Sequence, residues 1–332
     1  MTTEQTPELS QPTNPPSVAA NITQTDGESR VVQINSTSTT GSTPSIWKRA
    51  RVSLLRAGWP ILAIIMLGIM IFLAVLGPSL ALKDPNRRTL VDRLTPPLQA
   101  DETGHIEYIL GTDGGGRDVL SRLIYSARVS ISVGFVAVAV GGTIGTSLGL
   151  ISGYFGGRTD AIIMRLADIQ LAFPFILLAI MVLVVLGDGI VNLILVLGIG
   201  QWVTYARIAR GETINQRDRE YVEAAHAIGT HHSRIIFRTI FPNVLPPLIV
   251  IASFNVASVI LAEAALSFLG LGVPPTVPTW GSMLAESRDQ IIGGFWWLAI
   301  FPGVAIMLTV LSLNLLGDWL RDFLDPRLRG EI

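Results

Sequence analysis

Six long apolar stretches decide what this chain can fold into. A hydrocarbon core about 30 Å thick is crossed by about 20 residues of α-helix. The stretches that reach this length are residues 59–81, 130–152, 166–187, 189–208, 245–270 and 296–317. Backbone polar groups in a bilayer must be satisfied internally, which favours helices. The sequence therefore predicts an all-α polytopic membrane protein with six transmembrane helices in a lipid bilayer.

The composition agrees with a membrane protein. Only 15% of the 332 residues are charged and the mean hydropathy is +0.52, whereas soluble domains carry about 25% charged residues. The formal net charge of −1 argues against a nucleic-acid partner, which would require a basic excess. The chain has no Cys, which excludes disulfides and thiolate nucleophiles.

The remaining segments have distinct compositions. Ser, Thr and Pro dominate the first 46 residues, which we expect to form a disordered cytoplasmic tail. Small residues at 79–81 would suit a signal-peptide cleavage site, but the long preceding tail favours a transmembrane span. The expected organisation is a tail at 1–46, a basic segment and first span at 47–82, an extracytoplasmic loop at 83–129, a five-helix core at 130–318 and a cytoplasmic tail at 319–332.

Charge and aromatic residues predict the orientation. Most of the 24 Lys and Arg residues fall in segments on the same side as the N-terminus, which favours cytoplasmic termini. The loop at 83–129 carries its own basic residues and weakens this rule, although long loops can translocate with their charges. Trp296, Trp297 and Trp319 flank the last span, as aromatic belts do.

Small residues and prolines predict how the spans pack. Gly141, Gly145, Gly149 and Gly153 recur every four residues, so one face of their helix admits another backbone, most simply within this chain. Prolines at or inside span ends are expected to kink or break helices; they are Pro174, Pro242, Pro246, Pro247 and Pro302.

Catalytic patterns are missing. A Walker phosphate loop ends in Lys followed by Ser or Thr, and neither Lys48 nor Lys83 stands in that context. The Gly-rich segment 111–118 lacks the Lys and is interpreted as a structured turn. The four His residues show no ligand spacing, and no G-x-S-x-G elbow occurs. We expect no catalytic residue, no metal and no bound cofactor, hence no enzyme.

Two carboxylates fall within spans. Asp168 lies near one end of the third span, whereas Glu263 lies deep in the fifth. A buried charge in a membrane faces a bundle interior or a cavity. Glu263 is therefore either a pathway or gate residue or an interhelical hydrogen-bonding residue, and the sequence leaves both open.

The polar segment 209–242 predicts a short helix. Asp218 is a suitable N-cap, and Tyr221, Ala225 and Ile228 are spaced at i, i+4 and i+7. Gly229 is a natural residue to end the helix, and the small Ala224 and Ala225 permit close approach of a partner. The alternative is a surface helix packed on its own bundle. A helix this short is marginal alone, so other contacts must hold it.

This segment resembles the signature loop of ABC importer permeases. The pattern E-A-A-x-x-x-G is present at Glu223, Ala224, Ala225 and Gly229, with Pro242 thirteen residues beyond; Thr239 and Phe241 stand where the family usually has Ile and Leu. Segments 110–130, 153–157, 261–284 and 314–330 are similar to the C-type permease of dipeptide, oligopeptide and nickel importers. The similarity covers about residues 48–330.

The resemblance implies a type I importer permease of the bacterial plasma membrane that works by alternating access. It implies a B-type permease partner, cytoplasmic ABC ATPase subunits that hydrolyse ATP, and an extracytoplasmic solute-binding protein. The implied ATPase-coupling residues are Tyr221, Glu223, Ala224, Ala225, Ile228 and Gly229. The expected cargo is peptides.

Alternatives remain at this stage. Nickel or another small solute would suit the same permease pattern. An ion-coupled secondary transporter would show inverted repeats, and none is visible by eye. A membrane receptor or scaffold could also use segment 209–242 to dock a partner.

Overall fold

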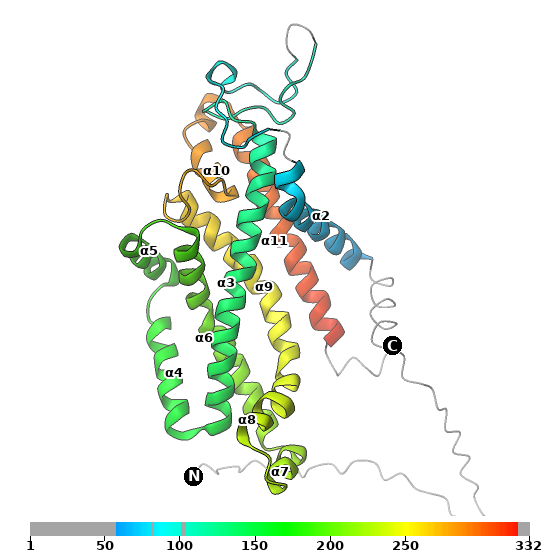
Figure 1. Ribbon diagram of the computed structural model, residues 1–332, viewed down its shortest axis with the longest axis vertical. Coiled ribbons are helices and arrows are strands. Elements are labelled where there is room, and N and C mark those ends of the chain that lie inside the picture. Colours follow the sequence, from blue (N-terminus) through cyan, green and yellow to red (C-terminus); the bar gives the residue numbers. More distant parts are fainter. Residues whose placement is uncertain (1–57, 81–82, 101–103, 325–332) are drawn as a thin grey trace, which may run out of the picture. The chain divides into compact units, whose positions relative to one another are not determined.

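The computed structural model describes residues 58–80, 83–100 and 104–324, and these residues are mostly helical (Figure 1). The described part contains no β-strand, only isolated bridges. Its longer helices are α2 (Trp59–Leu80), α3 (Val119–Phe155), α4 (Gly157–Leu171), α5 (Phe175–Leu186), α6 (Ile190–Arg217), α7 (Glu220–Ala227), α9 (Phe241–Phe268), α10 (Trp280–Ser287) and α11 (Trp297–Leu324). The shorter ones are η1 (Leu90–Asp92), α8 (His232–Arg234), η2 (Ile235–Ile240) and η3 (Ile291–Gly293). The all-α prediction is confirmed, and the expected N-terminal tail lies outside the described residues.

Five helical segments of the described chain are long and apolar enough to cross a membrane. These are α2, α3, α6, the continuous run His232–Phe268, and α11. The helices α4 and α5 make a sixth span only if they are counted together, because they meet at an angle of 87°. Pro174 stands at the start of α5, where its missing N–H and fixed φ end the preceding helix. The expected third span, 166–187, is therefore divided between α4 and α5, and the predicted break at Pro174 is confirmed.

Several helices extend beyond their expected bounds. Helix α3 begins at Val119 because the Asp118 side chain accepts a hydrogen bond from the Ser121 N–H at 2.9 Å and caps the first turn. Helix α6 continues to Arg217 and α11 to Leu324, so parts of the expected loop 209–242 and of the tail after residue 318 are helical.

The glycine stripe of α3 packs against α6. A Cβ at Gly141, Gly145 or Gly149 would overlap a backbone carbonyl of α6. These two helices share the most extensive contact in the described chain. The predicted close approach within the chain is confirmed, and its physical cause is the absence of side-chain atoms along one face.

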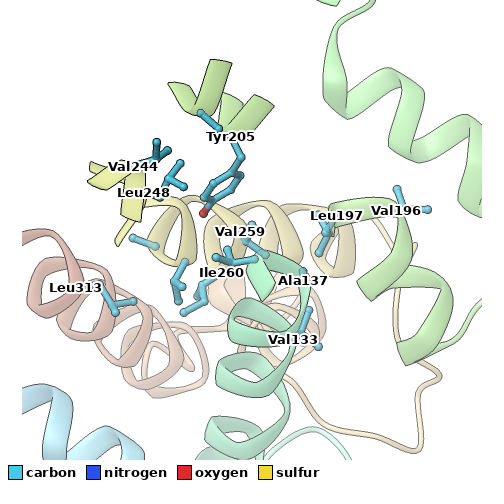
Figure 2. Packing of buried hydrophobic residues seen from close by; sticks show 14 of the residues in the cluster. Val133, Ala137, Val196, Leu197, Tyr205, Val244, Leu248, Val259, Ile260 and Leu313 are labelled. Carbon is cyan, nitrogen blue, oxygen red and sulfur yellow. The ribbon is translucent and has the colours of Figure 1, made fainter. Parts of the chain in front are cut away.

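The largest apolar cluster of the described residues is built mainly from α3, α6, α9 and α11 (Figure 2). Val133 and Ala137 come from α3, Leu197 from α6, Ile260 from α9 and Leu313 from α11; all are buried. Tyr205 of α6 and Val244 and Leu248 of α9 belong to the same cluster (Figure 2). The core fixes α3, α6, α9 and α11 against one another, and these helices carry the sites described below.

The two ends of this bundle carry different structures (Figure 1). One end holds α7 and α8 and is called here the α7 end. The opposite end holds α10 and the loop that precedes α3, and is called the α10 end.

Candidate functional site

Helix α7 owes its short length to clear signals at both ends. Glu220 and Glu223 lie in its first turn, where negative charge complements the helix dipole. At its other end, Gly229 has φ +75° and donates to the His226 carbonyl at 2.9 Å, while Thr230 donates to the Ala225 carbonyl at 3.1 Å. This pair of bonds is a Schellman motif, which favours glycine. The prediction that Gly229 ends the helix is confirmed.

The predicted N-cap is wrong. Arg219, with extended φ and ψ, is the N-cap residue, and Asp218 instead ends α6. The Asp218 carboxylate accepts from the Arg217 guanidinium at 3.1 Å. Sequence reasoning missed the one-residue offset because α6 runs on to Arg217.

Three contacts hold α7 on the bundle. Val222 is its only buried residue. The Tyr221 hydroxyl donates to Gln216 of α6 at 2.6 Å and accepts from Asn243 of α9 at 3.4 Å. His226 lies against Tyr154 of α3, with 3.2 Å between its Nε2 and the tyrosine oxygen. These contacts explain how so short a helix persists.

Much of the remaining surface of α7 is accessible. Glu223 and Ala224 are exposed, Ile228 is 82% exposed, and Tyr221 is partly exposed although its hydroxyl is bonded to the bundle. Ala225 instead packs against the core. The accessible surface of α7 therefore combines one large apolar side chain with a carboxylate and a small residue. The structure thus brings five of the six predicted coupling residues to an accessible surface and places Ala225 beneath them.

A wide helical turn follows the α7 segment. Residues Ile235–Ile240 form a π-helix, and the Phe241 N–H reaches back to the Ile236 carbonyl. Pro242 lacks the N–H that an α-turn would donate to the Arg238 carbonyl, which weakens the α register here. Such π turns are often found at functional sites. A proline is predicted to disturb the helix in this place, but no local residue pattern signals the turn type.

Glu263 lies at the opposite half of the bundle in a closed polar cluster. Its side chain is fully buried in α9. It accepts hydrogen bonds from Ser130 of α3 at 3.2 Å and Ser267 of α9 at 2.8 Å. The Ser130 hydroxyl in turn accepts a hydrogen bond from the backbone N–H of Trp280 at 3.3 Å. The cluster therefore joins α3, α9 and the start of α10.

An ion cluster at the α10 end was missed by sequence reasoning. Arg117 and Arg122 both contact Asp113 and Glu286, with 2.7 Å from Arg117 Nε to Asp113 and 2.6 Å from Arg117 Nη2 to Glu286. Arg122 is only 2% exposed. Burial alone would raise the pKa of Asp113, but Arg122, Arg117 and backbone N–H donors outweigh it and hold that pKa below its usual value. The Gly-rich segment 111–118 is thus a structured turn, as predicted, and it is tied to α10.

Two histidines of the α7 end lie close to one another. His226 and His232 have ring centroids 5.6 Å apart. Within residues 58–80, 83–100 and 104–324, no group of three or more His, Asp or Glu side chains is arranged to hold a metal ion. Asp168, the other carboxylate found within a span, forms an exposed ion pair with Arg207 at 2.7 Å.

A multi-pass helical bundle that exposes a short, well-anchored helix between two spans is the architecture of a transport permease. Residues 145–330 match the family described as "Binding-protein-dependent transport system inner membrane component". The chain belongs to this family, and it is therefore a membrane transport component.

Known proteins support this assignment. The chain is 42% identical to a di/tripeptide transport system permease protein DppC of Pseudomonas aeruginosa, over 79% of this chain and 86% of the relative. It is 45% identical to a glutathione transport system permease protein GsiD of Pectobacterium atrosepticum, over 67% and 73%. A chain of the inward-facing MetNI methionine ABC transporter has the same fold, with a TM-score of 0.51, 18% identity and coverage of 61% of this chain and 96% of that chain.

Proposed function

We propose that this chain is one of two permease subunits in an ATP-driven importer for short peptides. Its relatives carry peptide substrates in their names, including di/tripeptides and glutathione. The single observation that carries the mechanism is the exposed face of α7, with Ile228 in solvent and Gly229 ending the helix. Nickel or another small solute remains the alternative cargo within the same family.

The proposed partners follow from the same architecture. A cytoplasmic ABC ATPase subunit would bind the exposed face of α7, a B-type permease would complete the pore, and a solute-binding protein would deliver cargo at the α10 end. This assignment places the α7 end in the cytoplasm of a bacterial cell, as the basic residues near α7 favour.

ATP would drive transport by shifting the bundle between two arrangements. Closure of the ATPases moves α7, and α7 biases the spans toward one of two states. The short apolar and acidic surface of α7 suits a groove with a basic rim. The chain itself would hydrolyse nothing and would bind no cofactor.

The role of Glu263 is proposed to be interhelical. Its full burial and its hydrogen bonds to Ser130 and Ser267 support a residue that holds α10 on α3 and α9. A gate or pathway residue would instead need access to the transported solute.

Co-purification tests the proposed partners. The tagged native chain, extracted in mild detergent, is expected to retain a second permease and ATPase subunits. Glu223→Ala with Gly229→Asp should weaken ATPase retention at least tenfold. A matched control is Asp289→Ala with Gly294→Asp, which makes the same changes at an exposed Asp and a left-handed glycine of the α10 end, where φ is +85°. Equal retention of the ATPases in both variants would count against the proposal.

Reconstitution then distinguishes the cargo and the energy source. The purified complex with its solute-binding protein is placed in liposomes and offered labelled dialanine or Ni²⁺. Uptake of dialanine that requires internal ATP supports the proposal. Uptake that instead follows a proton gradient without ATP would favour a secondary transporter, and uptake of Ni²⁺ alone would assign the alternative cargo.

A further inference from the structure

We propose that Tyr154 is a positioning residue that fastens the α7–α8 segment to the α3–α6 pair and delivers the movement of α7 to these spans. The inference rests on the proposed coupling role of α7 and adds a specific route for the motion. Tyr154 lies in the last turn of α3 and is 7% exposed.

One hydroxyl contacts both helices of the segment. The Tyr154 oxygen is 3.2 Å from His226 Nε2, near the end of α7, and 2.7 Å from His232 Nδ1, at the start of α8. A hydroxyl has one donor and two acceptor sites, so it can bond to both rings at once. The rings also pack on one another: the His226 ring stacks on the tyrosine at 6.0 Å, and the His232 ring meets it edge-on at 5.6 Å.

The other side of Tyr154 is held firmly. Arg217, the last residue of α6, donates to the Gly153 carbonyl at 3.2 Å. One residue earlier, Ser152 donates to Asp160 of α4 at 2.5 Å, and Arg210 of α6 donates to the same carboxylate at 2.7 Å. The ends of α3, α4 and α6 are therefore bonded together. A displacement of Tyr154 must move them as a group.

The backbone connects α7 to its neighbours on both sides. It reaches α6 through Asp218 and Arg219, and it reaches α9 through α8 and the π turn Ile235–Ile240. A π turn lacks the regular α hydrogen bonds, so it transmits axial displacement less stiffly. The side-chain link through Tyr154 bypasses this turn and reaches α3, whose glycine face is in backbone contact with α6.

The test measures the motion of α3 without requiring a known cargo. A bimane fluorophore is attached at Ile151→Cys, a position 38% exposed on α3, in the otherwise Cys-free chain within the purified complex. ATP addition should change its fluorescence in the wild-type background. In Tyr154→Phe, which keeps the ring but loses the hydroxyl, this change is expected to fall at least threefold, with subunit retention and ATP hydrolysis per complex maintained. Tyr205→Phe, which removes the hydroxyl from another buried tyrosine, is the matched control.

A double-mutant cycle separates transmission from simple destabilisation. His232→Ala should reduce the signal as Tyr154→Phe does, and the double variant should be no worse than the more affected single one. A full ATP-dependent signal in Tyr154→Phe, or additive losses in the double variant, would overturn the inference. Failure of the proposed function would be visible separately, since the wild-type chain would then retain no ATPase.

Discussion

The glycine stripe shows how one missing methyl group determines helix packing. A Cβ at Gly145 would overlap the Trp202 carbonyl, whereas a Cβ at Gly142, on the same helix, would meet the Tyr205 ring at an ordinary 3.5 Å. We expect Gly145→Ala to destabilise the protein by about 2 kcal/mol or more through overpacking, and Gly142→Ala to be nearly neutral. Thermal unfolding of both variants in the same detergent measures the difference. Equal melting temperatures would show that α3 and α6 can separate at no cost.

The ion cluster at the α10 end makes a prediction about pH. Because the folded-state pKa of Asp113 is lowered, its ionic contacts stabilise the protein above the ordinary carboxyl pKa, about 3.9, and the stabilisation is lost as the pH falls through the lower folded value. Asp113→Asn should therefore lower the stability by about 3–5 kcal/mol, equally at pH 7 and pH 5. The two proteins should converge only below about pH 4. Convergence already between pH 7 and pH 5, measured by thermal unfolding, would contradict the lowered pKa.

At the scale of elements, the sequence predicts what local periodicity and helix-ending residues determine. The glycine face of α3, the break at Pro174 and the end of α7 at Gly229 all follow from single residues with restricted backbone or side-chain options. The ion cluster does not, because Glu286 joins the local Asp113, Arg117 and Arg122 group only after α10 folds back on α3. Long-range charge pairing leaves no trace in local spacing.

The π turn before α9 gives a prediction at the same scale. Pro242→Ala restores an N–H that can donate to the Arg238 carbonyl, so the turn should tighten toward the α register. Tightening rotates α7 relative to α9, and we expect uptake to fall at least fivefold although the variant is no less stable. Uptake and melting temperature are measured on the same preparation. Pro302→Ala, inside α11 and away from α7, is the control.

Glu263 distinguishes a structural contact from a pathway residue. Glu263→Gln keeps an oxygen that can accept from Ser130 and Ser267, so uptake should stay within twofold of wild type. Glu263→Leu leaves those buried hydroxyls without their acceptor and should destabilise the protein by about 1–3 kcal/mol. Stability by thermal unfolding and uptake in liposomes are compared. Loss of uptake in a fully stable Glu263→Gln protein would instead favour the gate role.

At the scale of the whole molecule, the two ends of the bundle must face different compartments if α7 meets an ATPase. The absence of Cys makes the orientation directly measurable, because each introduced thiol is the only one in this chain. Val91 of η1 and Ile292 of η3 are 94% and 93% exposed at the α10 end, and Ile228 is 82% exposed at the α7 end.

A membrane-impermeant maleimide applied to intact spheroplasts should label Val91→Cys and Ile292→Cys, whereas Ile228→Cys should be labelled only after permeabilisation. The positive-inside rule alone does not decide this, since the loop before α3 carries basic residues of its own. Because all three residues are largely exposed, their thiols should react wherever the reagent has access. Denatured samples of all three variants must label equally, so that a negative result in spheroplasts reflects the membrane barrier. Labelling of Ile228→Cys in sealed spheroplasts would place α7 outside and would remove the physical basis for coupling to a cytoplasmic ATPase.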